Sequence, residues 1–244
     1  MVYLARHYQP GVHHHSNTKG GGMKRFLAVA VFVTVAVLGA NVHAQQGTGG
    51  QGTGPYGTIL VGLNILSDSE INGFTNTTDY GPLIGLGGAF GYDFGNFRVD
   101  GEIAFRINEI NSVGGTPLVG GSYTAAFSYM VNGYFDLPTD GPWKPYIGGG
   151  IGFATVAIDW NRPGFFPLSQ VPVAGGSDSG VAYQFSGGIG YEINPKSTVS
   201  FGYRYFAVEE LQMVFDSGSP FGSGPFTMEY QSHEFNLVVR YMFN

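Results

Sequence analysis

The sequence contains no cysteine, and only 11% of its 244 residues are charged. Disulfide bonds therefore cannot stabilise the fold, which excludes the small disulfide-stapled scaffolds of secreted proteins. Basic residues are especially scarce after residue 44, where 7 Lys and Arg stand against 17 Asp and Glu, a net charge of −10. A chain with this balance is a poor partner for nucleic acids and for other acidic surfaces.

Long apolar runs are also lacking. The longest stretch, residues 26–38, is too short to cross a bilayer comfortably as a helix. It follows the basic Lys24-Arg25 and precedes a small-residue Val-x-Ala site that ends at Ala44. We therefore predict a secretory signal peptide over residues 23–44, cleaved after Ala44, in preference to a single membrane anchor helix. Residues 1–22 precede this complete signal without helical or strand periodicity, so we interpret them as an unstructured upstream mis-start.

Glycine and aromatic residues are abundant, with 41 glycines and 15% aromatics. Residues 45–55 form a Gly/Gln/Thr linker that we expect to be flexible. The last stretch, 234–243, shows where the aromatics fall, because alternate residues share one face of a strand. Its apolar face consists of Phe235, Leu237, Val239, Tyr241 and Phe243. A strand of this length and pattern is typical of a tilted membrane-spanning β-strand.

Seven upstream segments show the same alternation. With the last stretch, they predict eight strands at 56–66, 83–94, 97–107, 123–136, 143–157, 181–193, 198–207 and 234–243. Residues 67–80, 108–121, 159–180 and 208–228 are predicted to be long loops.

Two regularities favour a membrane barrel over a soluble one. Long connections follow the odd-numbered segments and short turns the even-numbered ones, as expected for surface loops and periplasmic turns. No Lys, Arg, Asp or Glu falls on the apolar face of any segment, whereas a soluble barrel turns a charged face to water. The sequence therefore predicts an all-β fold, an eight-stranded antiparallel up-and-down transmembrane β-barrel over residues 56–244.

Four motifs resemble a known family, the small eight-stranded outer-membrane barrels that include the OmpA membrane domain and opacity-protein-like, porin-family surface antigens. They are WKPYIGGGIGFA at 143–154, SGGIGY at 186–191, FGYRY at 201–205 and RYMF at 240–243. The resemblance covers residues 56–243. It implies the outer membrane of a Gram-negative-type bacterium, contact with outer-membrane lipid, insertion by the barrel-assembly machinery, and a monomer. It also implies that Tyr241 and Phe243 are the membrane-assembly signal, although here Asn244 follows the aromatic on which family members usually end.

Residues that could carry chemistry are few. After residue 44 the only histidine is His233, and Ser232-His233-Glu234 offers the residue types found in outer-membrane lipid-modifying enzymes. Adjacent strand residues point to opposite faces, so these three cannot form a relay with one another. Glu209-Glu210 is interpreted as solvated loop charge, and the histidines at 13–15 belong to a segment that processing removes. We therefore expect no catalytic residue, no cofactor site and no metal site.

Nine charged residues fall on the inner face of the predicted strands. We call them the lumen network: Asp93, Arg98, Asp100, Glu102, Arg106, Glu192, Arg204, Glu234 and Arg240. Side chains fill an eight-stranded barrel, and buried charges must be paired. Both signs occur at each depth, which predicts a plug of ion pairs with a narrow or absent pore. Glu102 and Arg204 are predicted to form a buried pair or to share a network with Arg240.

The four predicted long loops are acidic, with ten carboxylates against one basic residue, Arg162, a net charge of −9. The carboxylates are Asp68, Glu70, Asp79, Glu109, Asp159, Asp178, Glu209, Glu210, Asp216 and Glu229. Such a rim favours a basic or cationic surface ligand, although solvation alone also accounts for it.

The leading functional hypothesis is a non-enzymatic outer-membrane protein whose barrel anchors four acidic surface loops, for envelope integrity or surface recognition. The first alternative is a small porin that passes ions or small solutes. The second is a lipid-modifying outer-membrane enzyme. Conductance in planar bilayers separates the first hypothesis from the porin, because fold alone does not fix function.

Overall fold

The computed structural model describes residues 53–67, 70–71, 74–75, 78–81, 83–165 and 169–243. The predicted upstream segment, signal peptide, Ala44 cleavage site and most of the linker lie outside these residues and remain predictions. Within the described residues, no helix is long and apolar enough to cross a membrane. The strands are β1 (Gly54–Leu66), β2 (Glu70–Ile71), β3 (Phe74–Thr75), β4 (Thr78–Gly81), β5 (Leu83–Asp93), β6 (Phe97–Val113), β7 (Thr116–Pro117), β8 (Tyr123–Asp136), β9 (Trp143–Pro163), β10 (Gln170–Asn194), β11 (Ser197–Phe215) and β12 (Gly224–Met242).

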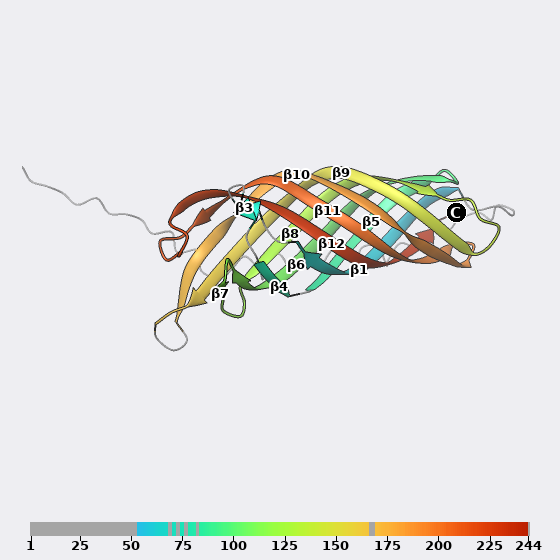
Figure 1. Ribbon diagram of the computed structural model, residues 1–244. Coiled ribbons are helices and arrows are strands. Elements are labelled where there is room, and N and C mark those ends of the chain that lie inside the picture. Colours follow the sequence, from blue (N-terminus) through green and yellow to red (C-terminus); the bar gives the residue numbers. More distant parts are fainter. Residues whose placement is uncertain are drawn as a thin grey trace, which may run out of the picture. The chain divides into compact units, whose positions relative to one another are not determined.

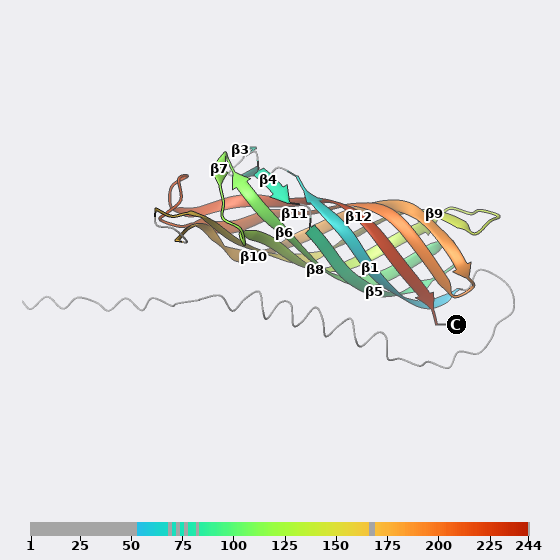
Figure 2. The same cartoon turned by 90° about the horizontal axis from the view of Figure 1, so that it is seen from below.

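Eight long strands form a barrel in the order β1-β5-β6-β8-β9-β10-β11-β12, and every neighbouring pair is antiparallel. β1 and β12 close it, pairing from Tyr56 with Met242 to Leu66 with Ser232. Figure 2 shows β1 beside both β12 and β5. Short turns follow β5, β8 and β10 at the end that carries the C-terminus (Figure 1). The predicted antiparallel eight-stranded barrel is therefore confirmed.

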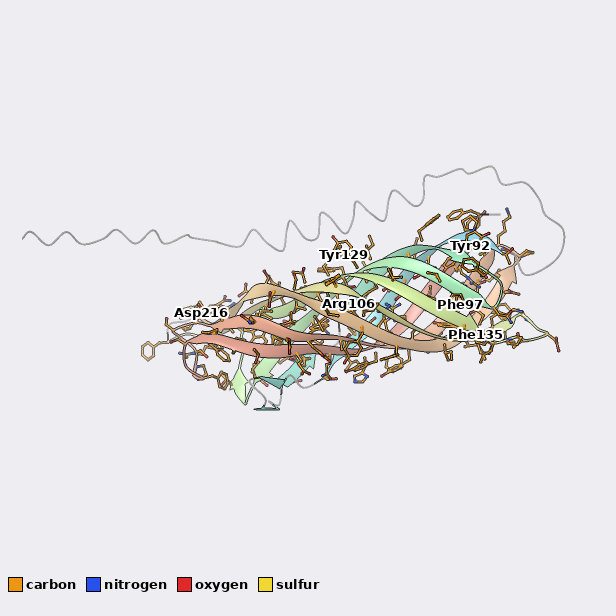
Figure 3. The ribbon with its side chains drawn as sticks, turned by 90° about the horizontal axis from the view of Figure 1, so that it is seen from above. Tyr92, Phe97, Arg106, Tyr129, Phe135 and Asp216 are labelled. Carbon is orange, nitrogen blue, oxygen red and sulfur yellow. The ribbon has the colours of Figure 1, made fainter. Side chains whose placement is uncertain are left out.

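The outside of the barrel is apolar toward the end with the short turns. Alternate residues of each strand project outward there, and Phe90, Phe153 and Phe185 are each more than 60% exposed. Tyr92, Phe97 and Phe135 lie near the short-turn end, with Tyr129 farther along the wall (Figure 3). An apolar band flanked by aromatic girdles is the lipid-facing surface of an outer-membrane barrel. We call this part of the barrel the membrane section.

Inward glycines in β9 make room for side chains of β8. A Cβ atom added to Gly148 would overlap Tyr134, and one added to Gly150 would overlap Asn132. The side chains of Tyr134 and Asn132 therefore occupy interior space that side chains at Gly148 and Gly150 would otherwise take. This close packing accounts for the glycines at 148 and 150.

Three of the four predicted long loops are wrong over much of their length, because the strands continue. β9 extends to Pro163 and β10 begins at Gln170, while β11 ends at Phe215 and β12 begins at Gly224. β6 likewise continues to Val113, and β1 begins at Gly54, inside the predicted linker. In the remaining loop, β4 pairs with the outer part of β6. The wall thus continues beyond the membrane section as an outer extension, formed by residues 107–113, 123–126, 155–163, 170–182, 206–215 and 224–232.

The polarity of the strand faces reverses between the two parts. In the membrane section of β12, Phe235 and Leu237 face outward while Glu234 and Asn236 are buried inside. In the extension of the same strand, Phe226, Met228 and Tyr230 are buried inside, whereas Thr227 is exposed and Glu229 half-buried. Water replaces lipid outside the wall at this level, so the apolar face turns inward. The predicted loops therefore begin where the outside of the wall changes from lipid to water, but the strands continue past that level.

A bulge in β11 keeps its apolar residues inside. The register with β12 shifts between Val208 and Leu211, so two residues separate these buried side chains instead of one. The second of them, Glu210, has a φ of 57°, in the left-handed region that non-glycine residues rarely occupy. Bulges of this kind re-aim the side chains that follow. Here the bulge moves the inward positions from even to odd numbers.

Candidate functional site

The interior of the membrane section is held by layers of ion pairs. Nearest the short turns, Arg98 binds Asp136 with two hydrogen bonds, from Nε to Oδ2 at 2.6 Å and from Nη2 to Oδ1 at 2.9 Å. Arg240 Nη1 lies 2.9 Å from Asp93 Oδ2 and 3.8 Å from Asp136 Oδ2. Two arginines and two aspartates from β5, β6, β8 and β12 therefore neutralise one another across the barrel.

A second layer joins β6 to β11. Arg204 Nη1 and Nη2 donate to Glu102 Oε1 and Oε2 at 2.9 and 2.8 Å. Arg204 Nη1 also lies 3.8 Å from Glu234 Oε2. The structure thus brings Glu102 and Arg204 together, but the third member of the group is Glu234 and not Arg240. Arg240 is six residues farther along β12, toward the short turns, where Asp93 and Asp136 engage it.

Arg106 and Glu234 form the layer nearest the extension. Arg106 Nε lies 2.5 Å from Glu234 Oε1, and Nη1 donates to Ser128 Oγ at 2.8 Å. The guanidinium carbon is 3.9 Å from the centre of the Phe206 ring, a cation–π contact. Both charged side chains are at most 2% exposed. Arg106 lies between the end marked by Phe97 and Phe135 and the end marked by Asp216 (Figure 3).

Two members of the lumen network, Asp100 and Glu192, do not pair with an arginine of the described strands. Two residues not predicted from the sequence, Asp136 and Lys144, take part in the ion pairs. Asp100 is held by neutral donors, Tyr56 Oη at 2.8 Å and Asn132 Nδ2 at 2.9 Å. Glu192 is half-buried, 3.9 Å from Lys144 Nζ. Asp136 and Lys144 are the missed residues. Asp136 could have been found, because it shares the inward parity of Asn132 and Tyr134.

A cavity of about 40 Å³ separates the first two layers. Arg98, Arg204, Arg240, Asp100 and Glu102 are among the residues that line it. That volume holds about three water molecules. It is a small polar chamber within the plug and leaves the ion-pair layers on either side intact.

Removing Glu102 should destabilise the barrel. Glu102→Ala leaves the Arg204 guanidinium buried without its two-point partner, although Glu234 stays within 3.8 Å. We expect the free energy of unfolding to fall by about 3 kcal/mol, the lower end of the range for a broken buried ion pair. The urea midpoint after refolding into liposomes measures the change. An unchanged midpoint would show that Arg204 is solvated in the folded barrel.

The interior of the outer extension is mostly apolar, although Asn108, Thr124 and Ser232 are also buried there. Its core side chains are no more than 8% exposed, and they include Ile110, Val156, Ile158, Trp160, Phe206, Leu211, Met213, Phe215, Phe226 and Met228. The Phe215 and Phe226 rings stack with their centres 4.0 Å apart, and Trp160 Nε1 donates to Thr124 Oγ1 at 3.3 Å. Buried side chains of this kind pack closely against one another. Ion pairs and apolar packing therefore fill successive parts of the barrel.

The acidic residues predicted to line the rim mostly lie on the outer surface of the extension. Asp79, Glu109, Asp159, Glu209, Glu210 and Asp216 are exposed, whereas Asp178 and Glu229 are half-buried. Asp68 lies outside the described residues, and Glu70 belongs to β2. Arg162 Nε donates to the Gly218 carbonyl oxygen at 3.1 Å. Burial, together with the Asp159 carboxylate, raises the pKa of Tyr123, so this hydroxyl adds no charge to the rim near neutral pH.

Some rim carboxylates also brace the wall. Asp178 Oδ2 accepts a hydrogen bond from the Gln212 backbone N–H at 2.8 Å, across the stretch where the ladder between β10 and β11 is irregular. Glu209 Oε1 accepts one from Tyr183 Oη at 3.0 Å. These carboxylates stabilise the bulged region in addition to giving it charge.

His233 lies on the outside of the wall. Tyr203 Oη is 2.6 Å from its Nδ1, and the Tyr203 and Tyr205 rings pack within 6 Å of the imidazole. Ser232 Oγ donates instead to Glu234 Oε1 at 3.1 Å, inside the barrel. The three consecutive residues therefore face opposite sides of the wall and do not form a catalytic relay with one another.

The two residues of the predicted assembly signal lie at the end of the closing strand. Tyr241 is 47% exposed. The Phe243 ring lies 5.7 Å from that of Tyr241 and stacks 6.0 Å from that of Phe90 on β5. Aromatic side chains at this edge belong to the girdle that borders the bilayer.

Residues 30–243 match the family model described as outer membrane protein beta-barrel domain. The chain is 25% identical over 242 residues to outer membrane protein PagN of Salmonella typhimurium, which covers 91% of this chain and 100% of that protein. A Brucella abortus protein is 34% identical over 90 residues, 36% of this chain and 32% of its own length. Among solved structures, the outer membrane protein OprG from Pseudomonas aeruginosa superposes with a TM-score of 0.50 and 14% identity, over 79% of this chain and 99% of that one. That structure shares the fold.

Proposed function

Because this chain belongs to the outer membrane protein beta-barrel domain family and is an outer-membrane protein of Gram-negative bacteria, we propose that it is a closed, non-enzymatic anchor. Its barrel holds the acidic outer extension on the cell surface for recognition of a partner. The observation that carries the proposal is the filled interior, with ion pairs in the membrane section and an apolar core above them. The barrel-assembly machinery inserts it through Tyr241 and Phe243, and it acts as a monomer.

The filled interior argues against the alternative of a small porin. An ion that entered from the short-turn end would meet three layers in which Arg98, Arg204 and Arg106 are bound to carboxylates. Beyond them it would have to shed its water among the buried side chains of the extension core, such as Phe206 and Leu211. Transfer of an unpaired charge into such surroundings is highly unfavourable.

Single-channel recording in planar bilayers tests the closed state. The wild-type barrel should give no stable conductance steps. The double variant Glu102→Ala/Arg204→Ala, which removes the central ion pair, should also stay silent because the apolar core is unchanged. Heat-modifiable migration on gels verifies that both proteins are folded. Stable ohmic steps from the wild-type protein would refute the closed anchor and favour the porin.

A further inference from the structure

Two hairpin ends meet at the far end of the outer extension. β9 and β10 form one hairpin, and β11 and β12 form the other. Arg162 Nε donates to the Gly218 carbonyl oxygen, and the Asp216 backbone N–H donates to the Val173 carbonyl oxygen at 3.0 Å. A Cβ atom added to Gly218 would overlap Val171, so the hairpins also pack tightly. We call this joined end the tip.

The tip rests on a column of aromatic rings. Trp160 and Phe226 lie with ring centres 6.4 Å apart, Phe226 stacks on Phe215 at 4.0 Å, and Phe215 contacts Phe221 at 5.7 Å. The first three are buried, whereas Phe221 is 42% exposed. Phe221 is thus a surface side chain held from below by the core. A side chain fixed in this way loses little conformational entropy when a partner covers it.

The tip presents apolar side chains outward. Phe165 is 95% exposed, Val214 is 51% exposed, and Pro163, Pro220 and Pro225 are also exposed. Val214 pairs with Pro225, which places both on adjacent strands. A contiguous patch of exposed apolar side chains marks an interaction site, and aromatic side chains dominate binding energy at such sites.

The charge around the tip selects the kind of partner. Asp216 lies at this end of the barrel (Figure 3), and Asp159 is exposed on β9. The one basic side chain in the described part of the extension is Arg162, which is half-buried. A protein interface of typical size covers about 800 Å² of each partner, so it would reach from the tip to these carboxylates. Anionic lipid, nucleic acid and a second copy of this acidic tip would all be repelled.

We propose that the tip docks a protein surface that carries apolar side chains bordered by Lys and Arg. Phe165 and Phe221 supply the apolar anchors, while Asp159 and Asp216 face the basic border. The inference rests on the proposed function, because it names the partner class of the displayed surface. The proposed function and this inference can be refuted independently, because conductance of the wild-type barrel refutes the closed anchor whether or not the tip binds a partner.

Selection from random phage-displayed peptides tests the proposal, using the processed full chain in zwitterionic nanodiscs and empty nanodiscs for subtraction. Enriched peptides should combine aromatic or aliphatic residues with Lys or Arg. A synthetic peptide of the enriched sequence should bind the double variant Phe165→Ala/Phe221→Ala about thirtyfold more weakly. It should also bind Asp159→Asn/Asp216→Asn more weakly than wild type, with the difference shrinking as salt is raised.

Leu137→Ala is the matched control, because Leu137 is an apolar side chain of the same exposure, 42%, in the short turn after β8. Peptide binding to it should equal wild type. The proposal is overturned if no peptide is enriched over empty nanodiscs, if the enriched peptides lack basic residues, or if the double variant binds normally. Binding of anionic phosphatidylglycerol vesicles, or of a second labelled barrel, through Phe165 and Phe221 would also overturn it by identifying a different occupant.

Discussion

Replacing Glu234 by alanine is expected to lower the free energy of unfolding by about 5 kcal/mol, the upper end of the range for a broken buried ion pair. The carboxylate lies 2.5 Å from Arg106 and 3.8 Å from Arg204, so one substitution affects two buried guanidinium groups. Ser232 Oγ also loses its acceptor. The urea midpoint of the barrel refolded into liposomes measures the loss.

Glu192→Ala serves as the control for this prediction. Glu192 also faces a basic side chain, but it lies 3.9 Å from Lys144 and its side chain is 30% exposed. Its removal should cost less than about 1 kcal/mol, as for other solvent-accessible ion pairs. A second variant, Arg106→Met/Glu234→Gln, removes the buried pair without stranding the Arg106 charge and should recover part of the stability. If Glu234→Ala and Glu192→Ala lowered the free energy of unfolding equally, burial would not determine how much each ion pair contributes to stability.

Phe226→Ala is expected to cost about 4 kcal/mol, because truncating a buried aromatic side chain removes its contacts and leaves a cavity. The ring is 2% exposed, stacks on Phe215 and lies beside Trp160. The two tryptophans of the chain lie in different parts of the barrel, Trp143 on the outer face and Trp160 in the extension core. Trp160 fluorescence in a Trp143→Phe background therefore follows unfolding of the extension.

Val214→Ala provides the comparison for that core substitution. Val214 lies beside Pro225 in the same hairpin, but it points outward and is 51% exposed. Its truncation should change the free energy of unfolding by no more than about 0.5 kcal/mol. If both variants unfold at the same urea concentration as wild type, the extension does not contain a cooperative core.

The membrane section could be predicted from the sequence because one rule holds along all eight strands. Phe235, Leu237 and Val239 face lipid, and the alternate positions face the interior. The same rule failed in the extension. Met213 and Phe215 are apolar residues at alternate positions, yet they point inward, so a search for apolar faces turned toward lipid assigned them to a loop. If strands with an inward apolar face had also been considered, the predicted strands at 198–207 and 234–243 would have been longer and closer to β11 and β12.

The bulge at Glu210 could not be predicted in this way. It adds a residue between the inward Val208 and Leu211, which breaks the period-2 pattern where the strand passes from one part of the barrel to the other. The sequence predicted the pair of Glu102 with Arg204, but not which further residue joins it. Residue depth placed Arg204 near Glu102, but the choice between Arg240 and Glu234 as the third member depends on where the arginine side chains reach. The reach of these side chains across the interior is determined only once the barrel is closed.

The reversal of polarity along β12 fixes the depth at which the protein sits in the bilayer. Phe235 is the first outward apolar residue of the membrane section, and Gln231 and Glu229 face outward immediately beyond His233. If the barrel moved toward the periplasm, these polar side chains would enter hydrocarbon, whereas movement the other way would bring Phe235 and Leu237 into water. Both displacements are unfavourable. This reversal fixes the outer boundary of the hydrocarbon, and the aromatic girdle with Tyr241 and Phe243 marks the inner one, so a thicker or thinner bilayer has to deform around the barrel.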